Sequence, residues 1–368
     1  MSLDNSQQAF FALVKAGLWE QDARLLQFEK ISFQEVYRLA EEQSVVGLVA
    51  AGIDRFKIQD SGFKIPQKWA LQFIGHALQL EQRNIAMNHF VARLMEKLRK
   101  EDIYAILVKG QGIAQCYEKP LWRSSGDVDL LLDTENYEKA KKVLVPLAVD
   151  VESEYKSFRH LGLTMPGGFI VELHGTLHSR LSKRVDRVID EAQKDVFNGG
   201  NVRSWRNDNT TVSLPSPDND IVFVFTHILH HFYIEGIGLR QICDWCRLLY
   251  TYKDSLNYGL LESRIKNAGL MSEWKAFAAL AVDWLGMPVE VMPIYSNDQK
   301  WSRKAERIIT FVLECGNFGH NRLAATGKIS SAWYKIRDFV RHTRVFPWDS
   351  VKFFWHFLWN GIGLAVTK

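Results

Sequence analysis

The chain has 368 residues, of which 47% are hydrophobic and 24% are charged. This composition is typical of globular proteins and excludes a wholly disordered, collagen-like or coiled-coil chain. At about 150 residues per domain, the length predicts two or three domains. The 46 Lys and Arg residues exceed the 42 Asp and Glu residues by only four. So small an excess does not predict DNA or another nucleic acid as the main partner.

The chain carries four cysteines, and no repeat or low-complexity segment is visible. Four cysteines are too few for a dense disulfide framework, so a reducing compartment is the simpler expectation. Residues 1–8 are polar and lack the basic start and apolar core of a signal peptide. The longest uncharged stretch near the C-terminus, 353–367, is shorter than the roughly 20 residues of a membrane-spanning helix. We therefore expect a cytoplasmic protein without a transmembrane segment.

Residues 1 to about 100 show the periodicity of helices. The clearest pattern follows Pro66, whose ring suits the first turn of a helix, and it ends in the basic stretch 97–100. Apolar residues near helical spacing predict one long helix whose stripe is Leu71, Ile74, Leu78, Leu80, Ile85, Phe90, Leu94 and Leu98.

The pattern then changes to short apolar runs. They predict helices at 113–118 and 134–147, with a turn at 166–168 and strands at 104–108, 128–132, 149–156, 160–165 and 169–174. The polar stretch 198–220 is predicted to be a boundary loop or a short hairpin. Helical periodicity returns from about residue 218.

These patterns predict an α+β protein. A small mixed sheet with helices would occupy residues 101–200, between an N-terminal helical region, 1–100, and a C-terminal helical domain, 201–368. The aromatic segment 348–359 has two interpretations, contact with a membrane surface or packing on the helical core.

The second predicted strand carries two aspartates, Asp127 and Asp129. Alternation along a strand places them on one face, while Val128 and Leu130 point to the other and can anchor the strand. Two carboxylates this close repel each other in an apolar setting, and a divalent cation removes that repulsion. Most Asp-x-Asp pairs are solvated turn residues, so the pair alone does not identify a metal site. The stretches before and after it must support that interpretation. Mg²⁺ favours carboxylate oxygens together with substrate phosphates.

Two neighbouring stretches favour a phosphate-handling site. Upstream, Lys109 and Gly110 end a predicted strand and, with Gly112, precede a predicted helix whose backbone N–H groups can hold phosphate oxygens. Downstream, Glu172 and His174 share one face of an apolar strand, where a carboxylate is costly unless it is paired or ligated. Three acids from two neighbouring strands suit two-metal phosphoryl chemistry.

The order of these motifs resembles the DNA polymerase beta-like nucleotidyltransferase superfamily. The matching residues are Lys-Gly at 109–110, Arg-Ser-Ser-Gly-Asp-Val-Asp at 123–129 and Glu-Leu-His at 172–174. The chain is similar to the bacterial branch of uncharacterised nucleotidyltransferases, and toxin nucleotidyltransferases of abortive-infection systems share the Arg-x-Ser-x-Asp-x-Asp pattern. The resemblance covers residues 103–180 and extends to His-x-x-His and Leu-Arg-x-x-x-Asp motifs within 227–244. Residues 109–112 depart from the Gly-Ser or Gly-Gly that usually precedes the acid pair.

The resemblance implies a small mixed nucleotidyltransferase sheet and a reaction that moves an NMP from an NTP to a hydroxyl, with pyrophosphate release. Asp127, Asp129 and Glu172 would be the catalytic acids and would hold two Mg²⁺ ions, or Mn²⁺ in their place. The substrate-binding residues would be Lys109, Gly110, Gly112, Arg123, Ser124, Ser125, His174 and Arg240.

Some of these residues have a second interpretation. Arg123 could pair with Asp127 or Asp129 and offset their charge, and Arg240 could pair with Asp244, four residues further along a helix. Three histidines lie at helical spacing without a further zinc ligand nearby, and we expect them to be hydrogen-bonded or to line the cleft: His227, His230 and His231.

The sequence leaves the acceptor open among a small molecule, a protein hydroxyl and an RNA end. The competing function is a non-catalytic nucleotide-binding or regulatory module of the same fold. The intact set of three acids favours the enzyme.

Overall fold

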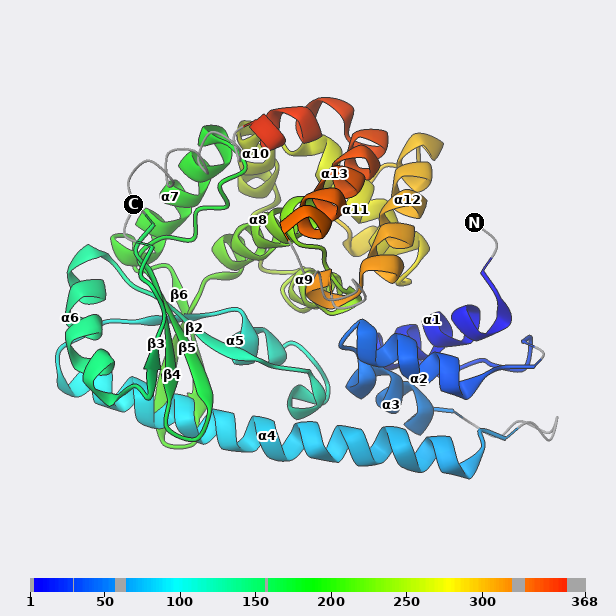
Figure 1. Ribbon diagram of the computed structural model, residues 1–368, viewed down its shortest axis with the longest axis horizontal. Coiled ribbons are helices and arrows are strands. Elements are labelled where there is room, and N and C mark those ends of the chain that lie inside the picture. Colours follow the sequence, from blue (N-terminus) through cyan, green and yellow to red (C-terminus); the bar gives the residue numbers. More distant parts are fainter. Residues whose placement is uncertain (1–2, 29, 57–63, 156–157, 320–327, 356–368) are drawn as a thin grey trace.

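The computed structural model describes residues 3–28, 30–56, 64–155, 158–319 and 328–355 (Figure 1). Three short helices come first: α1 (Asn5–Leu18), α2 (Phe33–Glu42) and α3 (Val46–Asp54). The Asp4 carboxylate accepts a hydrogen bond from the Gln7 N–H at 2.8 Å and caps the start of α1. In the part of the chain described, no helix has both the length and the apolar character needed to cross a membrane.

The long helix α4 (Gln67–Lys100) begins directly after Pro66 and ends in the basic residues, as predicted. Its 34 residues give a length of about 50 Å, and it runs beneath both the N-terminal helices and the sheet (Figure 1). The predicted apolar stripe is wrong in the first half, where Leu71 and Leu78 are 63% and 49% exposed. There α4 packs against α2 and α3 and not against the sheet's apolar cluster, and Phe73 and Ala77 supply the buried face.

The central sheet has the strand order β1-β2-β5-β4-β3. β2 and β5 are parallel, and every other neighbouring pair in this sheet is antiparallel. The strands are β1 (Ile106–Val108), β2 (Asp127–Leu131), β3 (Asp150–Val151), β4 (His160–Met165) and β5 (Phe169–His174). The prediction of a strand at 149–156 is wrong in length, because β3 is an edge strand that pairs only with β4 and does so over two residues.

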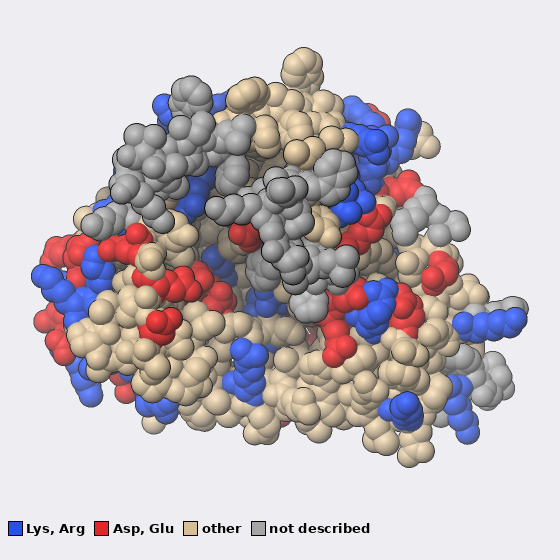
Figure 2. Space-filling view, in the orientation of Figure 1, with Lys and Arg blue, Asp and Glu red and all other residues tan. Residues whose placement is uncertain are grey.

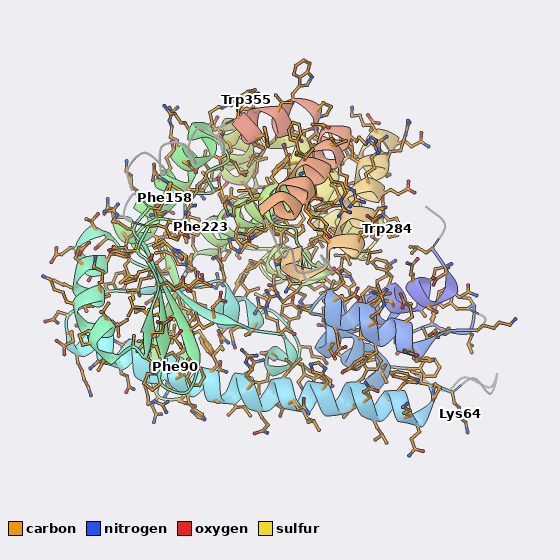
Figure 3. The ribbon with its side chains drawn as sticks, viewed as in Figure 1. Lys64, Phe90, Phe158, Phe223, Trp284 and Trp355 are labelled. Carbon is orange, nitrogen blue, oxygen red and sulfur yellow. The ribbon has the colours of Figure 1, made fainter. Side chains whose placement is uncertain are left out.

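The two faces of the sheet have different surroundings. Val128 and Leu130 lie, as predicted, in a hydrophobic cluster with the second half of α4 and with α6 (Thr134–Leu144). Phe90 of α4, labelled in Figure 3, lies below the sheet. Its ring stacks on that of Phe169 of β5, with centroids 4.5 Å apart. The other face carries the acidic side chains of β2 and β5, so burial of one face fixes the direction in which the acids point.

The helix predicted at 113–118 starts earlier and is shorter, as α5 (Gly110–Ala114). Lys109 has φ 57° and Gly110 has φ 39°, so the chain turns directly from β1 into the helix. A positive φ is strained for lysine and easily reached by glycine. The polar stretch after α7 (Lys183–Phe197) contains a hairpin, one of the two predicted alternatives, formed by β6 (Val202–Asn207) and β7 (Thr210–Pro215).

Helices cover the acidic face of the sheet. Helix α8 (Pro217–Ile234) begins with proline at its first position, which suits a helix start. The ring of its Phe225 packs against the rings of Trp245 and Trp274, with centroids 5.2 and 4.7 Å apart. Buried residues of α1 and α3 lie in the same hydrophobic cluster as these three aromatic residues. This cluster is distinct from the one between the sheet, α4 and α6. The division of the chain into three regions stays a prediction. The remaining helices are α9 (Leu239–Thr251), α10 (Tyr258–Ala268), α11 (Met271–Asp283), α12 (Gln299–Cys315) and α13 (Lys328–Val345).

The aromatic segment after α13 is described only as far as residue 355. Phe353 is buried, and its ring centroid lies 5.0 Å from that of Tyr233. This part of the segment therefore packs on the helical core. Trp348 and Trp355 are 86% and 61% exposed. The rest of the segment, 356–359, lies outside the described residues.

Gly17→Ala is expected to lower the free energy of unfolding by about 1–3 kcal/mol, as overpacking does. Gly17 lies where α1 crosses α3, and a Cβ there would collide with the backbone carbonyl of Leu48. Gly75→Ala on α4 is the matched control, because a Cβ there meets nothing within 4 Å. The control should be neutral or stabilising by up to about 1 kcal/mol. Urea denaturation curves that coincide for the two variants would contradict the close crossing.

Candidate active site

Three carboxylates meet on one face of the sheet. β2 and β5 run in parallel with Asp129 opposite Glu172, and Asp127 lies two residues before Asp129 on the same face. One carboxylate oxygen from each of these residues lies within 4.8 Å of the others. This spacing is close enough for the three side chains to share metal ions.

The charges of this cluster are only partly balanced within the protein. The Lys109 ammonium lies 2.9 Å from Asp129 Oδ1, and His174 Nε2 lies 2.8 Å from the same oxygen. Burial alone would raise the pKa of Asp129, but Lys109 and His174 bring that pKa below its usual value. Repulsion by Asp129, together with burial, raises the pKa of Asp127. Among the three carboxylates, Asp127 is therefore the one whose ionised form a bound cation would stabilise most.

Glu172 is held by two imidazoles. Its Oε2 lies 3.3 Å from Nε2 of His160 and 3.3 Å from Nε2 of His174. These contacts bring the pKa of Glu172 below its usual value, although burial opposes them. Burial likewise opposes protonation of His174, but contacts with Asp129 and Glu172 raise the pKa of this imidazole. Glu154, which lies between β3 and β4, does not belong to this cluster. Its Oε2 lies 2.8 Å from the Lys141 ammonium.

The acids form the wall of a cavity of about 260 Å³ between the sheet and helices α8 and α9. A second cavity, of about 380 Å³, adjoins it on the side of β4 and β5. Lys109, Glu172, His227 and His231 line both cavities. Phe158 and Phe223 line the second one and lie near the upper end of the sheet (Figure 3). The acid cluster thus has room for one group on each side.

The predicted substrate-binding residues fall into two groups. The first cavity is lined by Lys109, Gly110, Arg123 and Arg240, and the second by His174. The other three predicted residues are not among the described residues that line either cavity: Gly112, Ser124 and Ser125.

The three residues outside the cavity walls have clear packing roles. A Cβ at Gly112 would lie 2.8 Å from a methyl group of Leu214, so this glycine permits close packing against β7. The Ser124 carbonyl oxygen accepts a hydrogen bond from Arg123 Nη1 at 3.0 Å, and the Ser125 hydroxyl accepts another from it at 3.1 Å. Their part in substrate binding stays a prediction.

Arg123 is engaged by a residue of the C-terminal helices. Its Nε and Nη2 donate to the two carboxylate oxygens of Asp244 at 2.9 and 2.6 Å, and both side chains are buried. Asp244 also accepts a hydrogen bond from the Tyr117 hydroxyl at 2.7 Å. Arg240 Nη1 donates to the Ser124 carbonyl at 2.9 Å. Asp244 therefore replaces Asp127 and Asp129, the partners that the sequence had offered for Arg123.

The three histidines of α8 are placed as expected. His230 Nδ1 is 2.6 Å from the Ser179 carbonyl, His231 Nδ1 is 2.8 Å from Glu235 Oε2, and His227 lines both cavities. Burial lowers the pKa of His230 to about 4. All three histidines therefore line the cavity wall, and His230 and His231 are held there by hydrogen bonds.

Sequence reasoning missed His160. β4 and β5 form an antiparallel pair in which Met165 is opposite Phe169 and His160 is opposite His174. The short turn at 166–168 fixes this register, because each step away from the turn pairs the next two residues. Both strands and the turn were predicted, so the register could have identified His160 as a neighbour of His174.

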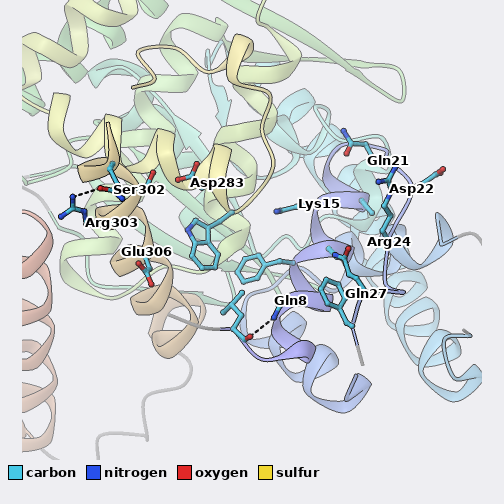
Figure 4. Close-up of a pocket in the computed structure, with 17 residues that line it drawn as sticks. Gln8, Lys15, Gln21, Asp22, Arg24, Gln27, Asp283, Ser302, Arg303 and Glu306 are labelled. Atoms are coloured by element: carbon cyan, nitrogen blue, oxygen red, sulfur yellow. Dashed lines mark hydrogen bonds between the residues drawn. The ribbon is translucent and has the colours of Figure 1, made fainter. Parts of the chain in front are cut away.

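A larger hollow lies elsewhere, between α1 and helices α11 and α12, with a volume of about 1150 Å³ (Figure 4). Its charged side chains are of both signs, among them Lys15, Arg24, Asp283 and Glu306. Neither group of described residues that could hold a metal ion lies here. The smaller cavity beside the three acids is therefore the candidate active site.

Arg123→Ala is expected to lower the free energy of unfolding by about 3–5 kcal/mol, because it leaves the Asp244 carboxylate buried without its cationic partner. Denaturation without added ligand measures this change. Arg38→Ala is the control, since Arg38 is 51% exposed where it pairs with Glu35, and such surface pairs contribute about 0–1 kcal/mol. An Arg123 variant as stable as the wild type would contradict the structural role.

Three comparisons with known proteins bear on this site. Residues 29–286 match the model of a family described as uncharacterised nucleotidyltransferase, which confirms the resemblance seen in the sequence. No curated protein matches the chain. A solved structure, described as an antigenic nucleotidyltransferase-like protein from Paracoccidioides brasiliensis, is 16% identical with a TM-score of 0.33, covering 55% of this chain and 93% of that chain. The family match spans more than half of the residues of this chain. The chain therefore belongs to the uncharacterised nucleotidyltransferase family.

Proposed function

We propose that this protein is a metal-dependent nucleotidyltransferase, which moves an NMP from an NTP to a hydroxyl of an acceptor and releases pyrophosphate. The observation that carries the proposal is the cluster of Asp127, Asp129 and Glu172 on the wall of a cavity that also exposes Lys109 and Arg240. Carboxylates suit divalent cations, and the two basic side chains suit the phosphates of a nucleotide.

The donor set fits Mg²⁺, or Mn²⁺ in its place. The three carboxylates supply hard oxygen ligands, and repulsion by the neighbouring Asp129, together with burial, raises the pKa of Asp127. Asp127 and Asp129 would hold two ions, and Glu172 would hold one of them. Bound ions would neutralise the acids, activate the acceptor hydroxyl and stabilise the departing pyrophosphate.

The chain's own side chains position the reactants. The Lys109 ammonium lies at the cavity wall and can bind a phosphate oxygen as a point charge, while Gly110 lets the backbone approach the same phosphates. Arg240 lines the opposite wall and would bind the remaining phosphate charge. The NTP would therefore occupy the first cavity.

Glu172 lies between the two cavities and would face the acceptor. The acceptor oxygen would attack the α-phosphorus and form the new P–O bond, while the bond from that phosphorus to the bridging oxygen of the β-phosphate breaks. Pyrophosphate then carries away the electron pair, and Glu172 would accept the proton of the acceptor hydroxyl. The second cavity would hold the acceptor.

The face of the molecule shown in Figure 2 has Lys and Arg interspersed with Asp and Glu. Such a mixed surface, with a net charge of +4, does not favour a long nucleic-acid track. The acceptor stays open among a small molecule, a protein hydroxyl and an RNA end.

The proposal is tested by incubating the purified protein with Mg²⁺ and labelled NTPs, together with an extract of the cells in which the protein naturally occurs. We expect release of pyrophosphate and transfer of label to one class of molecule in the extract. NTP binding by calorimetry without any pyrophosphate release would instead favour a non-catalytic nucleotide-binding module.

Asp127→Asn and Asp129→Asn are each expected to reduce transfer by roughly 100-fold or more, equivalent to about 2.7 kcal/mol of transition-state stabilisation. Loss of the Asp127 charge, which the neighbouring Asp129 repels, should leave the metal-free fold intact or stabilise it. Asp129→Asn should instead lower the stability of the metal-free fold, because it leaves the Lys109 ammonium without its buried carboxylate partner. Pyrophosphate release and a thermal melt check both expectations. Wild-type turnover in either variant would contradict the assignment of the acid pair.

Glu172→Gln is expected to reduce transfer more than NTP binding, because Glu172 faces the acceptor side of the site. Glu152→Gln is the matched control, since Glu152 lies just beyond the edge strand β3 and is exposed. Rates from single-turnover assays and NTP affinities from calorimetry separate the two effects. Loss of transfer in the Glu152 variant, with none in the Glu172 variant, would show that the third acid was assigned to the wrong strand.

A further inference from the structure

A second group of possible metal ligands lies beside the acid pair, Asp127 and Asp129. It consists of His160, Glu172 and His174, and one side-chain donor atom from each lies within 4.8 Å of the others. His160 and His174 are opposite each other on β4 and β5, and Glu172 lies two residues before His174 on the same face. Two paired strands thus position all three side chains, which gives the group a rigid backbone support.

Two of the three separations within the group match those of a coordination sphere, and the third, between the two imidazoles, is within 4.8 Å. Glu172 Oε2 lies 3.3 Å from each of the two imidazole Nε2 atoms. Charge-assisted hydrogen bonds between such groups are usually shorter, at about 2.7–2.9 Å. Ligands bound tetrahedrally at about 2.0–2.1 Å from a zinc ion are about 3.3 Å apart.

The chemistry of the donors differs from that of the acid pair. Mg²⁺ prefers an all-oxygen environment, whereas two imidazoles and one carboxylate suit Zn²⁺ and related transition metals. The side chains of His160 and His174 are 22% and 10% exposed, so the group is sheltered without being closed. All three residues line the cavity of about 380 Å³ on the side of β4 and β5, which leaves a coordination position open toward that cavity. Three protein ligands with an open position are typical of zinc sites that bind a further molecule.

We propose that His160, Glu172 and His174 form a binding site for a transition-metal ion of the Zn²⁺ type, separate in its ligand chemistry from the Mg²⁺ site. Its fourth position faces the second cavity and would take an oxygen or nitrogen ligand there. Glu172 belongs to both groups, so the two sites adjoin through one side chain. The inference does not depend on the proposed transfer reaction, because it concerns metal binding in the absence of nucleotide.

The test uses the full chain, stripped of metal with a chelator and titrated with Co²⁺ and Zn²⁺ without nucleotide. Co²⁺ is a spectroscopic probe, because tetrahedral nitrogen and oxygen coordination gives it a strong visible absorption band. We expect the band to form in the wild type and Zn²⁺ to displace the Co²⁺. Excess Mg²⁺ should not displace it, since Mg²⁺ disfavours imidazole ligands.

His160→Ala should abolish the Co²⁺ band and weaken Zn²⁺ binding by roughly tenfold or more. His160→Gln serves as a second variant that keeps a polar side chain, and metal-free thermal melts check that both variants are folded. His178→Ala is the matched control, because His178 lines the same cavity but pairs with Asp190 at 2.7 Å outside the group. Asp127→Asn is the second control, because Asp127 belongs only to the acid pair. Both controls should keep the band.

Three results would overturn the proposal: no Zn²⁺ binding by the wild type, unchanged binding in both folded His160 variants, or a band lost in Asp127→Asn but kept in His160→Ala. The last result would place the ion on the acid pair. A protein that binds Zn²⁺ as expected but transfers no nucleotide would contradict the proposed function alone. Active transfer by a protein without the Co²⁺ band would overturn this site alone.

Discussion

Electrostatic repulsion among three carboxylates is the constraint on which the rest of the site depends. Asp127, Asp129 and Glu172 bring oxygens within 4.8 Å of one another on a sheltered sheet face. Within the protein, Lys109 and His174 both engage the same oxygen of Asp129, which leaves Asp127 poorly compensated. A surface with this imbalance favours cations, and the adjoining cavities give those cations access to substrates.

The fold holds this repelling group in place from outside it. The loop before β2 is braced from one side by Asn84 of α4, whose amide donates to the carbonyls of Leu121 and Arg123 at 2.7 and 2.8 Å. From the other side, Asp244 of α9 binds the Arg123 guanidinium through two hydrogen bonds. The apolar face of the sheet packs on α4 and α6 at the same time. The strands carrying the acids are therefore fixed by contacts that do not involve the acids themselves.

Much of this arrangement could be predicted from the sequence, and the errors have physical causes. The strands at 160–165 and 169–174 and the long helix after Pro66 were predicted, because their apolar periods and turn residues are local signals. The hairpin before α8 was one of two alternatives predicted for its stretch. The edge strand was predicted too long, since its length depends on how far a neighbour pairs with it. The apolar stripe of α4 was wrong where its partners are helices rather than the sheet, as exposed Leu71 and Leu78 show.

The sequence by itself determined that Asp127 and Asp129 share a face, and that Glu172 and His174 share one on another strand, because side chains alternate along a strand whatever lies beside it. Only the tertiary structure decided that Asp129 lies opposite Glu172, and that Arg123 pairs with Asp244, 121 residues away. Strand order and the partners of buried charges are set by packing between distant segments, and no local pattern records that packing.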